Sequence, residues 1–318
     1  MAFKTSSSNV QKGTSEDIWK KKPKKMIGSR GKSLAEFDSP FGIVVDEKRE
    51  VFYVSDQGNF RIQVLDFEGD GLTSFGTAGK ANGQLNEPRG LTLHPTTGHV
   101  LVADSQNHRV QAFDDRGQFL MCIGEGEGKG GSLVADQIAG RLQTPSGVIC
   151  NSKGDIVVTD TGYHCGQIFD YGASAGPRFM RIFGHSNDQS THFAAPTDAC
   201  LDHWNRLVIA DQKLNRIGIW SADGSQHIKN IPLRVAPWSV CVSSNFSVLR
   251  LQHHQFMVST MNHNILVFDV RNNKLLQTLG LKGATAGFFS SPTCVRNFQD
   301  DLIVVDRDNA RLQFFQNP

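Results

Sequence analysis

The stretch PRGLTLHPTTGHVLVADSQNHRVQAFD, residues 88–114, decides the fold because its pattern returns along the chain. It opens with Pro and an apolar run, turns, continues in a second apolar run that ends in Asp104, and passes through a polar turn into a third run. FLMCIG, residues 119–124, adds a fourth run that closes in Gly. Four short runs rich in β-branched residues and joined by turns predict four antiparallel strands.

The same unit starts at six prolines along the chain. The starts read PFGIVVD (40–46), PRGLTLH (88–94), PSGVICN (145–151), PTDACLD (196–202), PWSVCVS (237–243) and PTCVRN (292–297). The fourth unit has only a weak last run, HIKNIP (227–232), without the closing Gly. A four-stranded sheet repeated radially predicts an all-β fold, a six-bladed β-propeller of four-stranded antiparallel blades. Helical repeats are disfavoured because the apolar alternation is near two.

The last unit ends after three runs, at LQFFQNP, whereas Met26-Ile27-Gly28 resembles a fourth run that precedes any unit. We therefore expect an N-terminal strand to complete the last blade, which removes two exposed sheet edges. The expected domains are a disordered basic N-terminal tail over residues 1–22 and the six-bladed propeller over residues 23–318.

Composition narrows the class of protein. No apolar run reaches the roughly 18 residues of a membrane helix, and the start has no apolar segment typical of a secretory signal, so a cytoplasmic protein is expected. The six cysteines form no C-x-x-C pair, which argues against a structural zinc site and against a disulfide framework. We expect no cofactor and no metal.

The N-terminal tail is strongly basic. Residues 1–25 carry seven lysines against Glu16 and Asp17, so the rest of the chain is near neutral. Five of the lysines form a run interrupted only by Pro23: Lys20, Lys21, Lys22, Lys24 and Lys25. This run resembles a nuclear localisation signal and could equally hold phosphates. The alternative is a solvated tail that leads into the closing strand.

The triplets Asn107-His108-Arg109 and Asn59-Phe60-Arg61, with the P-x-G starts and F-G ends, resemble the NHL-repeat family from about residue 24 to the end. The pattern decays where Cys165, Thr260 and Ala310 replace its usual residues. The resemblance extends to the C-terminal propellers of tripartite-motif NHL proteins, which bind RNA or protein and are often joined to RING, B-box and coiled-coil segments. No cysteine and histidine series in the first 25 residues could hold zinc, so only a link to ubiquitin-ligase pathways is implied.

The repeated Asp, Asn and Arg residues suggest a structural brace rather than a catalytic group. They recur in four units, as Asp56, Asn59 and Arg61; Asp104, Asn107 and Arg109; Asp211, Asn215 and Arg216; and Asp306, Asn309 and Arg311. An Asp that closes the turn and pairs with Arg would stabilise the same turn in each blade. The Gly-rich stretch 124–132 and His253-His254 are interpreted as loops.

One face of the ring is the expected binding site, because the loops that enter each blade and the turns between second and third strands meet there. We call it the proline face. The residues after the six starting prolines are Phe41, Arg89, Ser146, Thr197, Trp238 and Thr293, and the turns add Phe60, His108, Tyr163, His164, Asn262 and His263. Aromatic and Arg side chains serve both protein interfaces and base stacking. The alternative is that Phe41 and Trp238 only pack between blades.

These observations predict a non-enzymatic interaction module, a protein-binding adaptor or scaffold that acts as a monomer and takes no small-molecule substrate. The alternative is a regulator that binds single-stranded RNA, which would need Lys and Arg clustered around Arg89. A lactonase- or lyase-like propeller enzyme is disfavoured, because the innermost strands offer chiefly apolar groups.

Overall fold

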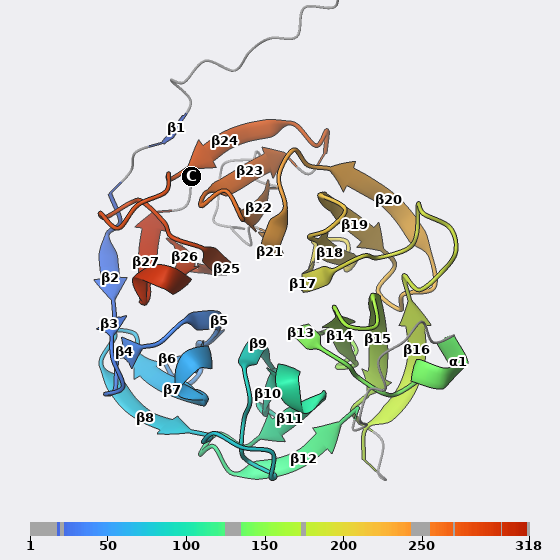
Figure 1. Cartoon of the computed structure of the whole chain (residues 1–318), viewed down its shortest axis with the longest axis horizontal. Coiled ribbons are helices and arrows are strands. Elements are labelled where there is room, and N and C mark those ends of the chain that lie inside the picture. Colours follow the sequence, from blue (N-terminus) through green and yellow to red (C-terminus); the bar gives the residue numbers. More distant parts are fainter. Residues whose placement is uncertain are drawn as a thin grey trace, which may run out of the picture.

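A computed structural model of the chain describes residues 18–19, 22–124, 135–172, 176–242, 255–269, 271–299 and 301–316. Six sheets stand radially around one axis, in chain order around the ring (Figure 1). The prediction of a six-bladed propeller of four-stranded antiparallel blades is confirmed.

Each blade runs from an inner strand to an outer strand. The first blade contains β5 (Pro40–Asp46), β6 (Val51–Asp56), β7 (Arg61–Asp66) and β8 (Gly71–Phe75), and the second contains β9 (Pro88–Leu93), β10 (Val100–Asp104), β11 (Arg109–Phe113) and β12 (Phe119–Ile123). The third contains β13 (Pro145–Cys150), β14 (Ile156–Asp160), β15 (Cys165–Asp170) and β16 (Arg178–Phe183), and the fourth contains β17 (Pro196–Leu201), β18 (Leu207–Asp211), β19 (Arg216–Trp220) and β20 (His227–Pro232). The fifth contains β21 (Pro237–Val242), β22 (Gln255–Thr260), β23 (Ile265–Asp269) and β24 (Leu275–Leu279), and the sixth contains β25 (Pro292–Phe298), β26 (Asp301–Asp306), β27 (Arg311–Gln316) and β2 (Lys25–Ile27).

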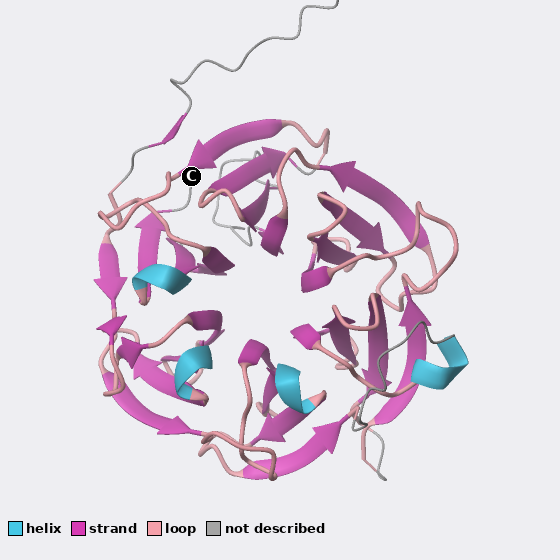
Figure 2. Cartoon of the chain, in the orientation of Figure 1, coloured by secondary structure: helices cyan, strands magenta, loops and turns pink. Residues whose placement is uncertain are grey.

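All six inner strands begin at the proline of the repeat, and each of these prolines is buried. Proline is tolerated at the first residue of a strand because the ladder there does not need its missing N–H. After the second strand, blades one, two and six turn through short 3₁₀ helices, η2 (Gln57–Asn59), η3 (Ser105–Asn107) and η4 (Arg307–Asn309), which lie between the inner and outer strands of their blades (Figure 2). A further short helix, α1 (Ala135–Ile138), lies at the periphery.

The hydrophobic core is divided among the interfaces between blades. Six large clusters each combine residues from two neighbouring blades; Phe52 and Ile303, for example, belong to the cluster between blades one and six. Every blade therefore buries both faces against its neighbours, as the repetition of half-apolar strands requires.

The sixth blade is closed by the N-terminal strand, as predicted. Strand β2 pairs antiparallel with β27, with Ile27 opposite Leu312, and Ile27 is only 5% exposed within the cluster between blades one and six. Gly28 follows with a φ of +97°, where an added Cβ would lie 2.4 Å from the Phe37 ring, so the chain can turn into blade one only with glycine here.

The basic tail was expected to be disordered through residue 22, and one short segment of it differs. Strand β1 (Ile18–Trp19) pairs in parallel with β24 and gives blade five a fifth strand. A two-residue strand has too little pattern to be recognised in a sequence of this composition. A parallel two-stranded pair, β3 (Ser29–Arg30) with β4 (Glu36–Phe37), links the closing strand to blade one.

Candidate functional site

The repeated Asp residues brace the turn between second and third strands, as expected. In blade two, Asp104 is fully buried and accepts hydrogen bonds from Arg109 Nε at 2.9 Å, Asn107 Nδ2 at 2.9 Å and Gln111 Nε2 at 2.9 Å. Asp56 and Asp306 have equivalent partners in blades one and six. The repetition of the same saturated geometry marks it as structural.

In two blades, other hydrogen bonds stabilise the same turn without the Asp–Arg ion pair. Asp160 in blade three accepts four backbone N–H groups, from residues 143, 144, 162 and 163, while Cys165 stands where four of the other blades have Arg. Burial raises the pKa of Asp160, and the N–H donors act against that rise. In blade five, Thr260 Oγ1 bonds Asn264 Oδ1 at 2.6 Å instead.

The braced turns place four of the predicted rim residues at one equivalent position. Phe60, His108, His164 and His263 have φ of +55°, +56°, +55° and +60°, the left-handed conformation that ends the turn. All four lie on the proline face, but His108 and His263 are engaged within the protein: His108 Nδ1 contacts the Gln143 carbonyl, and His263 Nδ1 accepts the Ser291 N–H at 2.9 Å. Asn262 is exposed.

Tyr163 does not lie on the surface of this rim. Its side chain is 5% exposed and packs with Ile138 and Cys165. Burial, and secondarily the Asp160 carboxylate, raises the pKa of Tyr163. Tyr163 belongs to the same turn as His164, but its side chain packs into a small core with Ile138 and Cys165.

Three of the predicted residues meet across the end of the axis on the proline face, which we call the mouth. The rings of Phe41 in blade one and Trp238 in blade five lie edge to face with centroids 6.0 Å apart. The Arg89 guanidinium, from blade two, lies 5.7 Å from the Phe41 centroid. Phe41 is 7% exposed and Trp238 is half-buried, so Phe41 and Trp238 pack across the ring rather than only between neighbouring blades.

Hydroxyl side chains that follow the starting prolines form hydrogen bonds between neighbouring blades at the mouth. Thr197 Oγ1 donates to the carbonyl of Trp238 at 2.7 Å, and Thr293 Oγ1 donates to the carbonyl of Phe41 at 2.8 Å. These two threonines therefore stabilise the backbone of the next aromatic residue around the ring. Ser146 is fully buried at this position, and its Oγ has no partner among protein groups.

Two lysines of the basic run make contacts within the protein. Lys24 Nζ pairs with Asp301 at 2.6 Å and Lys25 Nζ donates to the Phe67 carbonyl at 2.7 Å, so both attach the closing strand to its neighbours. Lys22 is exposed, whereas Lys20 and Lys21 lie outside the described residues, as do His253, His254 and nearly all of the Gly-rich stretch.

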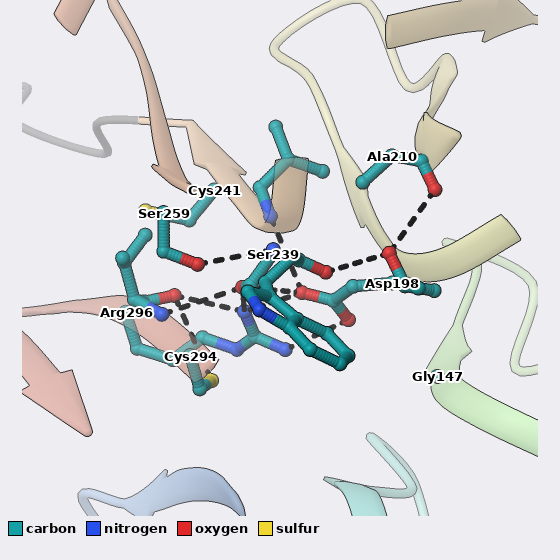
Figure 3. A network of polar contacts seen from close by, with 12 residues as sticks. Gly147, Asp198, Ala210, Ser239, Cys241, Ser259, Cys294 and Arg296 are labelled. Atoms are coloured by element: carbon teal, nitrogen blue, oxygen red, sulfur yellow. Dashed lines mark hydrogen bonds and ion pairs between the residues drawn. The ribbon is translucent and has the colours of Figure 1, made fainter. Parts of the chain in front are cut away.

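A charged network joins the inner strands of blades four, five and six (Figure 3), although the inner strands were expected to be chiefly apolar. Arg296 of blade six makes a two-pronged ion pair with Asp198 of blade four, at 3.1 and 3.2 Å. Ser239 Oγ of blade five donates to the same carboxylate at 2.5 Å. The signal was present in the sequence: Asp198 and Ser239 stand where blades one to three have the Gly of P-x-G.

Burial raises the pKa of the Cys200, Cys241 and Cys294 thiols beside this network. They are inert packing groups in this environment. Among the residues the structure describes, no group of three His, Cys, Asp or Glu side chains could hold a metal ion.

The distal face, opposite the mouth, holds a cavity of about 480 Å³ lined by residues of blades one, two and six, including Val44, Leu93 and Arg296. Its arginines are already paired: Arg49 with Asp46 and Asp115, and Arg296 with Asp198. The cavity therefore has few uncommitted charges.

Comparisons with known proteins agree with this architecture. Residues 85–113, in blade two, match the NHL repeat, which supports the resemblance of the six-bladed ring to NHL-repeat β-propellers. A search of curated proteins found no match. Within the described residues, no helix is long and apolar enough to cross a membrane.

Solved structures with a similar fold include two lyases. One is a catalytically inactive variant of virginiamycin B lyase from Staphylococcus aureus with quinupristin, at a TM-score of 0.60 and 13% identity over 92% of this chain and 88% of that one. Another is a streptogramin B lyase, at 0.59 and 14% over the same shares. A protein of unknown function from Bacteroides caccae matches at 0.55 and 12% over 80% and 81%. Likeness at this identity shows the fold alone.

Proposed function

We propose that this propeller is a non-enzymatic interaction module, a monomeric cytoplasmic adaptor or scaffold that binds a protein partner at the mouth. The observation that carries the proposal is the meeting of Phe41, Trp238 and Arg89, which come from blades one, five and two. Aromatic and Arg side chains in a partly desolvated cluster are the residues that dominate protein interfaces. A rigid ring that already holds them lowers the conformational entropy lost on binding.

Local charge favours a protein partner over RNA. Glu87 pairs with Arg89 at 3.2 Å and also accepts from Gln57 and Gln106, so a carboxylate stands beside the cation that RNA would need. The ring of Phe41 is buried and Trp238 stands at 89° to it, which leaves no open aromatic platform on Phe41 for a base. The likeness of the repeats to tripartite-motif proteins makes components of ubiquitin-ligase pathways the first partners to examine.

Affinity purification with three forms of the protein tests the proposal. The double variant Arg89→Ala with Trp238→Ala should lose specific partners, since truncating a hot-spot residue costs about 2 kcal/mol, roughly thirtyfold in affinity. The double variant Lys48→Ala with Lys153→Ala changes exposed side chains in turns of the distal face, so it should still bind the same partners.

Loss of the same partners with the Lys48 and Lys153 pair alone would assign binding to the distal face. Recovery of RNA, sensitive to ribonuclease and to Arg89→Ala, would replace a protein partner with RNA. Unchanged unfolding temperatures are needed in both variants, so that lost binding reports the surface and not the fold.

A further inference from the structure

Buried polar atoms without a protein partner gather at the mouth. Among the described residues, five such side-chain atoms belong to two rings of equivalent positions around the axis. The five are Gln57 Oε1, Arg89 Nε, Ser146 Oγ, Gln212 Nε2 and Arg307 Nε. Positions 89 and 146 follow the starting prolines, and positions 57, 212 and 307 follow the last residue of a second strand. Four of these atoms carry donor hydrogens, whereas Gln57 Oε1 is an acceptor. Buried polar atoms that no protein group satisfies are satisfied by water or by a ligand.

Two of these donors are guanidinium groups on blades that flank blade one. Arg89 comes from blade two and Arg307 from blade six, on either side of the blade that carries Phe41. Burial is the main cause that lowers the pKa of Arg89, and the positive charge of Arg307 lowers that pKa further. Among the described residues, Glu87 is the only acidic partner of Arg89, and Arg307 makes no ion pair. The two partly buried cations are thus balanced by one ion pair, which belongs to Arg89.

A carboxylate is the ligand that fits this arrangement. It accepts several N–H donors at once, pairs with guanidinium groups in fixed geometry and balances a charge that burial leaves under-compensated. Gln212 Nε2 and Ser146 Oγ are further donors around the same opening. A phosphate of single-stranded RNA shares this chemistry, but it would bring neighbouring phosphates toward Glu87 and bases to a buried Phe41 ring.

We propose that the mouth seats an acidic side chain, Asp or Glu, of the protein partner, with its carboxylate held between Arg89 and Arg307. This inference rests on the proposed partner-binding role of the proline face. Arg89 and Arg307 select the acidic residue, and the half-buried Trp238 supplies apolar contact to the residues beside it.

Selection of linear peptides tests the inference on the full chain. A displayed library of random twelve-residue peptides is selected on the wild-type protein, with the Arg89→Gln and Arg307→Gln variants as separate counter-targets. Arg116→Gln is the matched control, because Arg116 is exposed in a turn of the distal face. Enriched peptides should share one Asp or Glu position.

Synthetic versions then measure that position directly. Replacing the shared Glu or Asp by its amide should weaken binding to the wild type about ten- to hundredfold, since a hydrogen bond to a charged group contributes about 1.5–3 kcal/mol. Against Arg89→Gln or Arg307→Gln the same replacement should have little effect, and Arg116→Gln should behave as wild type. Two single variants guard against misfolding of either one.

The outcomes separate the two proposals. Enriched peptides that need Trp238 but share no acidic residue would overturn the carboxylate inference and leave the binding face in place. Peptides whose binding is lost only with Lys48→Ala and Lys153→Ala, or no enriched peptide at all, would count against both. Tighter binding of a random single-stranded RNA pool than of any peptide, sensitive to Arg307→Gln, would assign the site to phosphate.

Discussion

Neighbouring residues of the closing strand should differ sharply in their effect on stability. Ile27 is 5% exposed and packs in the cluster between blades one and six, whereas Met26, beside it, is 49% exposed. Truncating a buried Ile to Ala costs about 2–5 kcal/mol, because contacts are lost and a cavity remains. Ile27→Ala should carry that cost, and Met26→Ala should stay within about 0.5 kcal/mol.

Thermal unfolding measures the difference. An unfolding entropy of about 2.1 cal/mol/K per residue means that each kcal/mol shifts the Tm of a chain of this length by about 1.5 °C. We expect Ile27→Ala to lower the Tm by about 3–7 °C and Met26→Ala to lower it by less than about 1 °C. Deleting residues 1–30, which removes β1 and β2, should lower it further than deleting residues 1–17, which retains both strands. Equal Tm values for Ile27→Ala and Met26→Ala would show that the ring does not depend on this strand.

Four further predictions concern the network, pH, thiols and metals. Arg296→Met should lower the free energy of unfolding in chemical denaturation by about 3–5 kcal/mol, because it removes the ion-pair partner of Asp198. The double variant with Asp198→Asn should lose less than the sum of the two single variants. Additive losses would show that the two side chains are not coupled. Burial lowers the pKa values of His94 and His192 in the folded protein. The stability that these two side chains contribute above about pH 6.5 is therefore lost as the pH falls through their folded pKa values. Replacing both by Phe should flatten the curve of Tm against pH between about pH 7 and 5. In folded protein, Cys241 should react with iodoacetamide far more slowly than the partly exposed Cys122, as peptide mapping would reveal. The purified chain should hold no stoichiometric zinc or calcium and keep its Tm in EDTA; about one bound metal per chain in elemental analysis would favour an enzyme.

Features that depend on local pattern could be predicted from the sequence. Alternating apolar residues and turn residues set the strands, and recurrence of the starting proline set the number of blades. Even the weak fourth run at residues 227–232 forms a strand, β20. Closure by Ile27 followed from a missing strand at one end of the chain and a spare one at the other.

Side-chain contacts between distant blades could not be predicted in the same way. Asp198 and Arg296 are 98 residues apart in sequence, and neither belongs to a motif that marks it as paired. The burial of Tyr163 depends on a core formed with Ile138, from a loop whose path no repeat specifies. The placement of Phe41 against Trp238 depends on the width of the closed ring, which is set only when six blades have packed.

Differences between equivalent positions, rather than the repeat itself, give the two ends of the axis their chemistry. In blades one to three the third position of the repeat start is Gly, and an added Cβ on Gly90 would lie 2.6 Å from the Ser146 carbonyl oxygen. Such close approach leaves no room for a side chain between these inner strands. In blades four and five the same position holds Asp198 and Ser239, whose hydrogen bond fills the space and draws Arg296 across the axis. The position just before it differs among the blades that form the mouth, which carry Phe41, Arg89 and Trp238 there. A framework that braces each turn identically lets these positions vary without disturbing the fold, so a residue that departs from its repeat on an inner strand is the one to examine for binding.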